Sequence, residues 1–370
     1  MILVITLLLV LYSILILAFI IGFYLQKEII LEEKSNPHTA FSIVIPFRNE
    51  EENLLALLKS IAQLNYPTHL FEILLIDDES TDQSVAIIKE FQNSHSLSLN
   101  PKILNNQRKT GSPKKDALCL AINKSKNEWI LTTDADCIIP SNWLLLYEQQ
   151  IQLSSASFIA GPVSFLEGSN YFLDAFQKLD FLSLQGATIG SFGLRKPFMC
   201  NGANLAFKKS EFIKHSGYTG NTEIASGDDL FLMQKFIQDN TEKVAYLKSK
   251  EAIVQTQQQK SWSALFEQRK RWAAKSSAYK NWFGILVSWL VFLANLAFIV
   301  ALFYPKTYYF LILKIIVDFI LIAQAALFLK QKNVLKSYLW CALGYPLFTL
   351  VIVLSSQFSH YTWKKRIFKK

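Results

Sequence analysis

The stretch that decides the fold is Phe41-Ser-Ile-Val-Ile-Pro46. A short run of β-branched and other apolar residues is typical of a buried strand. The polar turn Phe47-Arg-Asn-Glu50 follows, and residues 51–64 then carry leucine and isoleucine at helical spacing. Acidic residues in the first turn of that segment favour a helix start, because they face the positive end of the helix dipole. A strand, a turn and a helix are therefore predicted in succession.

The same alternation continues along the chain. Further strands are predicted at residues 71–76, 102–104 and 129–133, and further helices at residues 84–91 and 116–124. Strands that alternate with helices form βαβ units, and such units build a mostly parallel sheet. In sheets of this kind, ligands bind beyond the carboxyl ends of the strands. The sequence therefore predicts an α/β domain with a ligand site at that edge.

Four other stretches have the length and apolarity of membrane spans. Residues 2–25 carry no charge and lack the basic start and the cleavage site of a signal peptide, so we expect an uncleaved anchor there. Three more apolar runs, at residues 282–304, 307–329 and 338–356, lie towards the other end. The expected architecture is thus an α/β domain with one N-terminal and about three C-terminal transmembrane helices.

The composition agrees with a membrane protein. Hydrophobic residues make up 51% of the chain and charged residues 18%, against about 25% charged residues in an average soluble domain. Lysine and arginine exceed aspartate and glutamate by 38 to 29, a net charge of +9. In a membrane protein such an excess indicates cytoplasmic flanks and anionic lipid, so we expect a lipid bilayer and no nucleic acid as partner. The four cysteines lack Cys-x-x-Cys spacing and support neither a disulfide scaffold nor a zinc ribbon.

Two acidic pairs directly follow predicted strands. Asp134 and Asp136 stand at alternate positions after one strand, where they could bind a hard divalent cation such as Mg²⁺ or Mn²⁺. Asp77 and Asp78 follow another strand. For this second pair two alternatives are open, because the carboxylates could bind a nucleobase or ribose, or could cap the following helix.

Two clusters lie further along. Ser226-Gly-Asp-Asp-Leu230 opens an apolar helical run, and an acid at that place is either a helix cap or a general base. Gln268-Arg-Lys-Arg-Trp272 stands ten residues before a predicted span. A basic aromatic helix there is typical of a membrane interface. Alternatively, Arg271 could neutralise a pyrophosphate and Trp272 could stack beside a sugar.

Lys314 and Asp318 interrupt one of the predicted spans. Residues four apart share a helix face, so the two side chains can pair with each other. Charges at membrane depth are costly and usually face a bundle interior or a wet cavity. The pair is therefore either structural or part of a substrate path.

In this order the segments resemble membrane-bound family 2 glycosyltransferases, the group that contains cellulose, chitin and hyaluronan synthases and many lipid glycosyltransferases. The matching segments are Ile45-Pro-Phe-Arg-Asn-Glu50, Ile76-Asp-Asp-Glu-Ser-Thr-Asp82, Lys114 before Ala117-Leu118, Thr133-Asp-Ala-Asp-Cys137, Asn201-Gly-Ala-Asn204, Gly227-Asp-Asp229 and Gln268-x-x-Arg271-Trp272. The resemblance implies a GT-A fold, an inverting sugar transfer from a nucleotide-diphospho-sugar, with a uridine diphosphate sugar expected, and a divalent metal, Mg²⁺ or Mn²⁺.

The resemblance also implies roles for single residues. It places donor contacts at Pro46, Glu50, Asp77, Asp78, Lys114, Asp134, Gln268, Arg271 and Trp272. It places acceptor contacts at Gly202, Asn204 and Trp272, and metal ligands at Asp136 and Asp134. Asp229 resembles the catalytic base, with Asp228 beside it. The processive synthases usually carry Thr-Glu-Asp or Glu-Asp where this chain has Gly227-Asp228-Asp229, so its handling of the acceptor departs from theirs.

The expected organisation has five segments. They are an anchor (1–25), a cytoplasmic transferase domain (26–260), an interface helix (261–281), transmembrane segments (282–360) and a basic tail (361–370). Nucleotide sugars are cytosolic, so we expect a multi-pass protein of the inner membrane. The acceptor is a lipid or a growing glycan, and a processive synthase that also exports its polymer is the alternative. The side of the tail stays open, because it would lie outside, against the positive-inside rule, if all three C-terminal runs cross, and inside if one of them is re-entrant.

Overall fold

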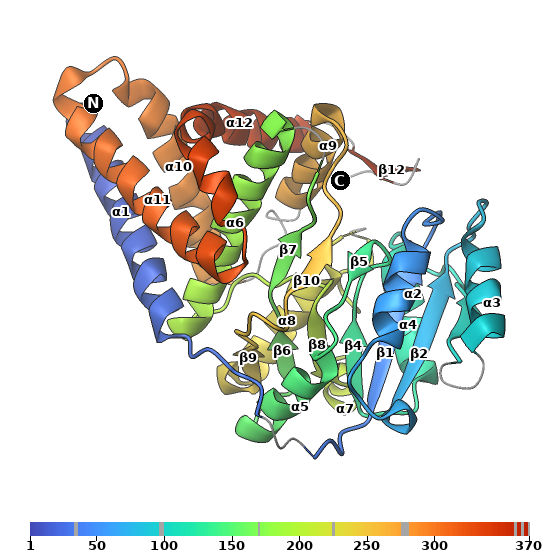
Figure 1. Ribbon diagram of the computed structural model, residues 1–370. Helices are drawn as coiled ribbons and strands as arrows, with labels where there is room; N and C mark the ends of the chain where they lie inside the picture. Colours follow the sequence, from blue (N-terminus) through green and yellow to red (C-terminus); the bar gives the residue numbers. More distant parts are fainter. Residues whose placement is uncertain are drawn as a thin grey trace. The chain divides into compact units, whose positions relative to one another are not determined.

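The computed structural model describes residues 1–32, 36–95, 100–168, 171–223, 226–274, 281–358, 361–363 and 366–368. The chain divides into two compact units, whose elements are labelled in Figure 1. The helical unit comprises Met1–Lys27, Glu167–Met199 and Gln258–Lys370. The sheet unit comprises Glu28–Leu166 and Cys200–Gln257. Parts of the predicted interface helix (275–280) and of the tail (364–365 and 369–370) lie outside the described residues.

The sheet unit is built on a seven-stranded sheet. Its strands are β1 (Phe41–Phe47), β2 (Phe71–Asp77), β3 (Lys102–Asn105), β4 (Trp129–Thr132), β6 (Phe158–Ala160), β8 (Leu205–Lys208) and β9 (Val244–Tyr246). Their order is β3-β2-β1-β4-β8-β6-β9. The first four are mutually parallel, β8 is antiparallel to β4 and β6, and β9 is parallel to β6. The predicted α/β sheet is thus confirmed as mixed and mostly parallel.

Strand β1 lies at the centre of the parallel part. The backbone of β1 is paired at both edges, with β2 and with β4, and the side chains of Phe41, Ile43 and Ile45 are completely buried. Phe47 at the end of β1 stands level with Asp77 at the end of β2. The loops that follow the two strands therefore begin side by side.

Helices connect these strands as the alternation predicts. They are α2 (Leu54–Ala62), α3 (Ser84–His95), α4 (Pro113–Lys124), α5 (Trp143–Leu153), α7 (Lys209–Lys214) and α8 (Asp228–Asp239), with the 3-10 helices η1 (Thr68–Leu70) and η2 (Thr241–Lys243). The predicted helices at 51–64, 84–91 and 116–124 correspond to α2, α3 and α4, with shifted ends. A second, small sheet has the order β5 (Cys137–Ile138), β10 (Val254–Thr256) and β7 (Val163–Phe165).

The helical unit consists mainly of long helices. They are α1 (Ile2–Leu25), α6 (Tyr171–Gly193), α9 (Trp262–Ala274), α10 (Trp282–Ala301), α11 (Tyr308–Phe328) and α12 (Tyr338–Phe358). The 3-10 helices η4 (Pro305–Thr307) and η5 (Lys332–Ser337) join the last three, and the short strands β11 (Tyr361–Trp363) and β12 (Arg366–Phe368) follow. In Figure 1, α12 lies across the group that α10 and α11 form.

Glycines allow α1 and α6 to pack backbone to backbone. A Cβ atom on Gly22 would lie 2.1 Å from the carbonyl oxygen of Gly190, and one on Gly193 would lie 1.8 Å from that of Gly22. Real Cβ atoms do not approach that closely, so any side chain at these positions would force the two helices apart. Helix α6 was expected inside a contiguous domain at 26–260. It belongs instead to the helical unit, because its glycines and apolar residues pack against α1 and α11.

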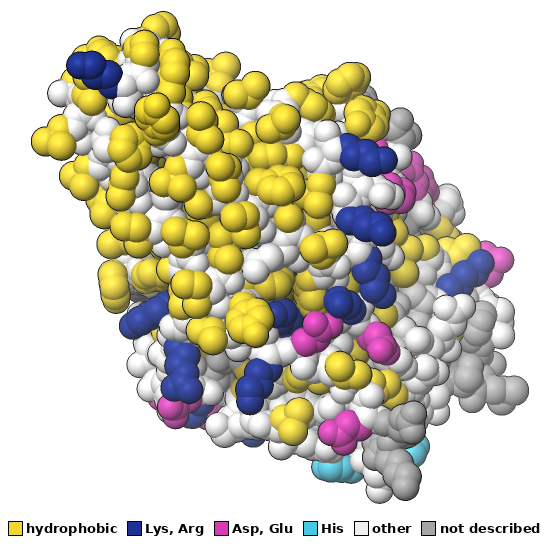
Figure 2. All heavy atoms as spheres, turned by 60° about the vertical axis from the view of Figure 1, so that its left-hand side comes forward, with side chains coloured by type: hydrophobic (Ala, Val, Ile, Leu, Met, Phe, Trp, Pro, Cys, Tyr) yellow, Lys and Arg dark blue, Asp and Glu magenta, His cyan; other side chains and the backbone are white. Residues whose placement is uncertain are grey.

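Four helices of the described residues are long and apolar enough to cross a membrane. They are Ile2–Leu25, Trp282–Ala301, Pro305–Phe328 and Lys332–Gln357. Figure 2 shows hydrophobic side chains over most of the face that these helices present, with few charges among them. Leu3, Ile14 and Leu343 are among the exposed apolar side chains of these four helices.

The two charges inside α11 pair with each other, as their spacing predicts. Lys314 Nζ lies 2.7 Å from Asp318 Oδ2, and Tyr12 of α1 donates a hydrogen bond of 2.7 Å to Asp318 Oδ1. The ammonium group also lies 4.6 Å from the centre of the Tyr12 ring. The pair thus faces the interior of the bundle, where its partners offset the cost of burying charge.

Candidate active site

A lysine links two acidic segments at the carboxyl edge of the sheet. Lys114 lies in the first turn of α4, and its Nζ is 2.8 Å from Oδ1 of Asp134. The same nitrogen is 3.3 Å from Oδ2 of Asp228, in the first turn of α8. The side chains of Lys114 and Asp228 are only 20% and 11% exposed. The structure therefore brings together three residues that the sequence only suggested as neighbours.

The two carboxylates keep the lysine charged. Burial by itself would lower the pKa of Lys114, but the negative charges of Asp134 and Asp228 outweigh it and raise the pKa well above its usual value. The positive charge is therefore present at every physiological pH. It neutralises part of the negative charge that these acids place at one edge of the sheet.

Asp229 is held at the same edge by backbone N–H groups. Its Oδ2 accepts a hydrogen bond of 3.1 Å from the amide of Gly202, and its Oδ1 accepts one of 2.7 Å from the amide of Leu230. The turn before it requires Gly227, whose φ of 82° is left-handed. Asp228 and Asp229 then occupy the first helical turn, where the helix dipole stabilises negative charge.

Gly202 lies beside both acids. Thr132 at the end of β4 donates a hydrogen bond of 2.7 Å to its carbonyl oxygen. A Cβ atom on Gly202 would stand 3.3 Å from Asp228 Oδ2 and 3.5 Å from Asp229 Cβ. A small residue is therefore needed here if the space next to the acids is to stay open.

Asp134 and Asp136 lie on one tight turn between β4 and β5. The amide of Cys137 donates a hydrogen bond of 3.2 Å to the carbonyl of Asp134, which closes the turn. Burial raises the pKa of the Cys137 thiol, and the neighbouring Asp136 and Asp134 raise it further. Cys137 is therefore a neutral packing residue, and the carboxylates are the groups that the turn presents. Two partly exposed carboxylates on one turn are a donor set that fits Mg²⁺ or Mn²⁺.

Asp77 and Asp78 have different surroundings. Asp77 Oδ1 accepts a hydrogen bond of 2.9 Å from the amide of Ser80, so it stabilises the loop after β2. Asp78 is buried, and its Oδ1 accepts bonds from Arg108 Nε at 2.7 Å and Asn106 Nδ2 at 2.8 Å. Neither caps α3, because Asp82 Oδ1 accepts the bond from the amide of Ser84.

Two arginines complete this group, and sequence reasoning did not find them. Arg108 Nη2 donates to the carbonyl of Asp78 at 3.0 Å and pairs with Glu79 Oε2 at 2.6 Å. Arg48 Nη1 donates to the same carbonyl and lies 3.9 Å from Glu79 Oε2. Arg48 Nε is buried without a hydrogen-bond partner among the described residues. Only their positions in the sequence pointed to the site, because Arg48 follows strand β1 and Arg108 follows strand β3, and both strands end at the carboxyl edge.

Pro46 and Glu50 bracket the loop after β1. Pro46 stands level with Ile76 in the sheet, which puts it next to the last residues of β2. Glu50 Oε2 accepts a hydrogen bond of 2.7 Å from Asn53 Nδ2, and the amide of Glu50 donates to Ser84 Oγ at 2.8 Å. Both predicted donor residues therefore lie at the carboxyl edge, and Glu50 also fixes the start of α2.

The structure gives Asn204 a structural role instead of the predicted acceptor contact. Its side chain is completely buried. Trp143 Nε1 and the Tyr147 hydroxyl each donate to its Oδ1 at 2.8 Å. Its Nδ2 donates to the carbonyls of Pro162 and Ala252. Because all of its hydrogen-bonding capacity is used inside the sheet unit, we leave Asn204 out of the acceptor site.

The last predicted segment lies on α9 in the helical unit. Gln268 Oε1 accepts a hydrogen bond from Arg269 Nη1, and the Trp272 ring lies 6.3 Å from that of Phe181. Arg271 is partly buried near the end of the helix. Helix α9 covers Trp262–Ala274 of the segment predicted as an interface helix at 261–281.

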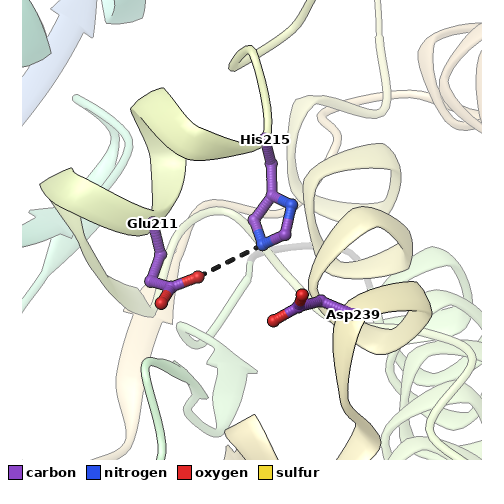
Figure 3. A group of neighbouring side chains, drawn as sticks. All are labelled: Glu211, His215 and Asp239. Atoms are coloured by element: carbon purple, nitrogen blue, oxygen red, sulfur yellow. Dashed lines mark ion pairs between the residues drawn. The ribbon is translucent and has the colours of Figure 1, made fainter.

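A possible metal-binding group at the far end of α8 is an ion network. The ligand atoms of Glu211, His215 and Asp239 lie within 4.8 Å of one another, as Figure 3 shows. Lys243 Nζ lies 2.8 Å from Asp239 and 3.3 Å from Glu211, and Lys214 Nζ lies 3.3 Å from each. The two ammonium groups supply the positive charge that a cation would bring, so we propose no metal there.

A mixed sheet with carboxylates and a bound lysine at its carboxyl edge defines a GT-A-like nucleotide-sugar transferase domain. The chain belongs to glycosyl transferase family group 2, which matches residues 129–356, more than half of it. The description of glycosyl transferase family 2 matches residues 42–178. The fold resembles that of a mannosyltransferase from Pyrobaculum calidifontis in complex with GDP-Man and Mn²⁺, with a TM-score of 0.56 and 14% identity over 96% of this chain and 99% of the other.

Curated relatives match parts of the chain. The chain is 32% identical over 96 residues to the poly(ribitol-phosphate) beta-N-acetylglucosaminyltransferase TarS of Staphylococcus aureus, covering 26% of this chain and 16% of the relative. It is 26% identical over 199 residues to a poly(ribitol-phosphate) beta-glucosyltransferase of Bacillus spizizenii, covering 53% and 29%. It is 32% identical over 120 residues to a beta-monoglucosyldiacylglycerol synthase of a Nostoc species, covering 32% and 24%. The chain thus spans less than a third of each relative in these matches.

Proposed function

We propose that the chain transfers a sugar, with inversion, from a nucleotide-diphospho-sugar to a lipid or glycan acceptor. The contact of Lys114 with both Asp134 and Asp228 carries the proposal. Lys114 thereby links two groups of acids. One is the turn with Asp134, for which the resemblance implies donor and metal binding, and the other is the pair Asp228 and Asp229, for which it implies the catalytic base. The names of the relatives support the acceptor classes, since two describe transfer to poly(ribitol-phosphate) and one describes synthesis of a glycolipid.

In the proposed complex the donor lies along the carboxyl ends of β1, β2 and β4. Asp77 and Asp78, with Arg48 and Arg108 around them, would surround the nucleoside. Lys114 would bind the diphosphate, because its ammonium group can exchange a carboxylate for phosphate oxygens and remain paired with negative charge. A uridine diphosphate sugar is the first donor to test.

Asp134 and Asp136 would hold Mg²⁺ or Mn²⁺. A cation of this kind, when bound, stabilises the negative charge that develops on a leaving diphosphate. The oxygen donors of the turn and their position next to Lys114 fit that task.

Asp229 would act as the general base. The amides of Gly202 and Leu230 each occupy one lone pair of its oxygens, so its carboxylate is oriented and still has lone pairs free. It would accept the proton of the acceptor hydroxyl while that oxygen attacks the anomeric carbon. The bond from the anomeric carbon to the diphosphate oxygen breaks on the opposite face, which inverts the configuration.

A processive polysaccharide synthase is the second candidate. The segment Gln268-x-x-Arg271-Trp272 on α9 favours it, because it resembles the processive members of the family. The acceptor and the number of sugars added then differ, while the chemistry at Asp229 is the same. The length distribution of the labelled product, measured by mass spectrometry, separates the two candidates.

We further propose that the sheet unit lies on the cytoplasmic side of the inner membrane. At one end of the bundle, Phe23 of α1 contacts Phe328 of α11. Helix α10 starts at the same end, where Asn281 Nδ2 donates a hydrogen bond to the carbonyl of Pro197. Exposed basic residues follow the ends of α1, α6 and α11: Lys27, Arg195, Lys196 and Lys330. The opposite end, where Tyr304 contacts Met1, carries Lys306. The positive-inside rule makes the basic end cytoplasmic.

The C-terminal tail would then return to the cytoplasmic side. Strand β11 packs against α9, and α12 packs against α9 and α6. Helix α9 precedes the first C-terminal span and follows the sheet unit, so its neighbours are expected on the same side. We therefore propose three crossings, by α1, α10 and α11, with α12 in the membrane without crossing it. This arrangement also puts the basic residues of 363–370 inside, as the positive-inside rule prefers.

The proposed function is tested with the purified full chain in lipid nanodiscs. A panel of radiolabelled nucleotide sugars is offered with lipid extracts and glycan acceptors, and the product is analysed for anomeric configuration. Asp229→Asn should bind donor nearly normally but transfer sugar at least about 10²-fold more slowly, the usual scale for a lost general base. Weakened donor binding with an unchanged chemical step would make Asp229 a structural helix cap.

A further inference from the structure

A buried ion pair joins α9 to α6 within the helical unit. Arg269 Nε donates to Oδ2 of Asp180, and the side chains of both residues are 5% exposed. Other ion pairs on these helices have an open side. Glu167 in the pair with Lys178 is 93% exposed, and Glu267 in the pair with Lys270 is 34% exposed.

Arg269 also contacts Gln268 and Trp272, two residues for which the family resemblance implies contacts with donor or acceptor. Its guanidinium group lies 4.2 Å from the centre of the Trp272 ring, and its Nη1 donates to Gln268 Oε1. Phe181, the neighbour of Asp180 on α6, lies against the same tryptophan ring at 6.3 Å. One guanidinium group thus fixes the orientation of the amide of Gln268 and of the ring of Trp272.

The geometry points to Asp180 and Arg269 as a positioning pair, which sets Gln268 and Trp272 for contact with donor and acceptor. This inference rests on the proposed function, because the donor and acceptor contacts that the family resemblance implies for Gln268 and Trp272 exist only if the chain transfers sugar. Neither member of the pair needs to touch substrate. Arg269 acts through the two side chains that it holds, and Asp180 acts by fixing the plane of the guanidinium group.

Simple stabilisation explains the pair less well. A buried ion pair can often be replaced by apolar residues of similar volume without loss of stability, because burying the two charges costs about as much as their attraction returns. A planar guanidinium group does what an apolar residue cannot, since it stacks on an aromatic ring and donates hydrogen bonds in fixed directions at the same time. The contacts of Arg269 are therefore better explained by orienting Gln268 and Trp272 than by stabilising the packing of α9 on α6.

The test compares two variants with the wild type in nanodiscs. Asp180→Leu/Arg269→Met removes the pair but keeps its volume, and we expect a folded protein with a melting temperature at or above that of the wild type. Arg269→Lys keeps the charge but loses the planar stack on Trp272. Glu267→Gln is the matched control, because it breaks a more exposed ion pair, that with Lys270, on the same helix.

Two readouts separate positioning from a structural role. In both variants kcat should fall at least about 10-fold while the KM for the donor changes less than about 3-fold, since misplaced groups cost rate before they cost binding. The emission of Trp272, isolated by subtracting the spectrum of the same variant carrying Trp272→Phe, should shift in both. The control should match the wild type in kcat and in emission.

Each outcome decides the inference. If kcat stays within about 2-fold of the wild type and the Trp272 emission is unchanged in Arg269→Lys, the pair does not position the motif and the inference is wrong. If the double variant fails to fold, Arg269→Lys alone decides by the same criteria. If the wild type transfers sugar from no donor, the proposed function fails, and the Trp272 emission by itself then supports or overturns the orientation that the pair imposes.

Discussion

Lys114 and Asp228 lie far apart in the sequence, yet the ammonium nitrogen of one is 3.3 Å from a carboxylate oxygen of the other. Lys114 comes from the first turn of α4 and Asp228 from the first turn of α8. Asp134 shares the same ammonium group from the end of β4. The contact ties the segment before β4, the segment after it and the start of α8 into one polar site.

The first prediction concerns Lys114→Met, which removes the shared charge. We expect sugar transfer to fall at least about 10²-fold, because a positioned cation near a leaving diphosphate is among the strongest contributions to such a reaction. The free energy of unfolding should also fall by about 1–3 kcal/mol, since the buried Asp228 loses its ion pair with the ammonium group. Steady-state kinetics and thermal unfolding measure the two effects. Lys124→Met, at the exposed end of the same helix, should behave like the wild type.

The second prediction concerns the metal. Asp136→Asn should leave a folded protein with little metal-dependent transfer, because an amide is a poorer ligand than a carboxylate for a hard cation. Titration calorimetry with Mn²⁺ and transfer assays with and without a chelator measure binding and activity. Asp239→Asn, in the group drawn in Figure 3, should bind Mn²⁺ as the wild type does, because Lys243 and Lys214 already pair with Asp239. Full transfer by Asp136→Asn in both conditions would rule out the metal assignment.

The third prediction is a loss of stability in acid. Glu148 is 1% exposed, and burial alone would raise its pKa, but hydrogen bonds from the Tyr66 hydroxyl and from Thr39 outweigh this and lower the pKa. A lowered pKa stabilises the folded state above the unfolded value of about 4.3, and this contribution is lost as pH falls through the folded pKa.

Glu148→Gln tests that prediction. The variant should be less stable than the wild type by about 1–3 kcal/mol at neutral pH, because it places an amide among donors that suit a carboxylate. Its unfolding free energy should also decline less steeply between roughly pH 5 and pH 3. Denaturant titrations at several pH values give both quantities. Glu242→Gln, at an exposed position, is the control, and equal slopes for wild type and Glu148→Gln would contradict the assignment.

The fourth prediction concerns topology. In a chain whose own cysteines are replaced, single cysteines at Phe303, Glu90 and Phe368 are exposed to an impermeant thiol reagent on intact cells. We expect labelling at 303, which lies at the end of the bundle opposite the basic residues, and at neither 90 nor 368. Labelling after permeabilisation confirms that the unlabelled sites are reactive. Labelling of position 90 would defeat the cytoplasmic assignment, and labelling of position 368 would mean that α12 crosses the membrane.

Local sequence determined the elements and the edge at which the acids lie. The apolar runs at 41–46 and 71–76 became β1 and β2 because their residues are buried on both sides, and the carboxylates after them had to stand at the carboxyl edge. The uncharged run at 2–25 is helix α1 to the residue. Periodicity and length suffice for such statements, because a strand or a long apolar helix is decided mainly by the residues within it.

Tertiary structure alone decided which of those side chains meet. The sequence predicted an acceptor contact at Asn204. In the structure its side chain is buried and accepts hydrogen bonds from Trp143 and Tyr147. Arg48 and Arg269 stand inside segments that the sequence singled out, but the partners of these arginines and of Arg108 were not predictable, since an arginine looks alike in sequence whichever side chain it contacts. Helix α6 joined the helical unit because its glycines match those of α1 in space. Residues that contact each other in this way are mostly far apart in the sequence. They come within bonding distance only when the helices and strands of one unit pack together.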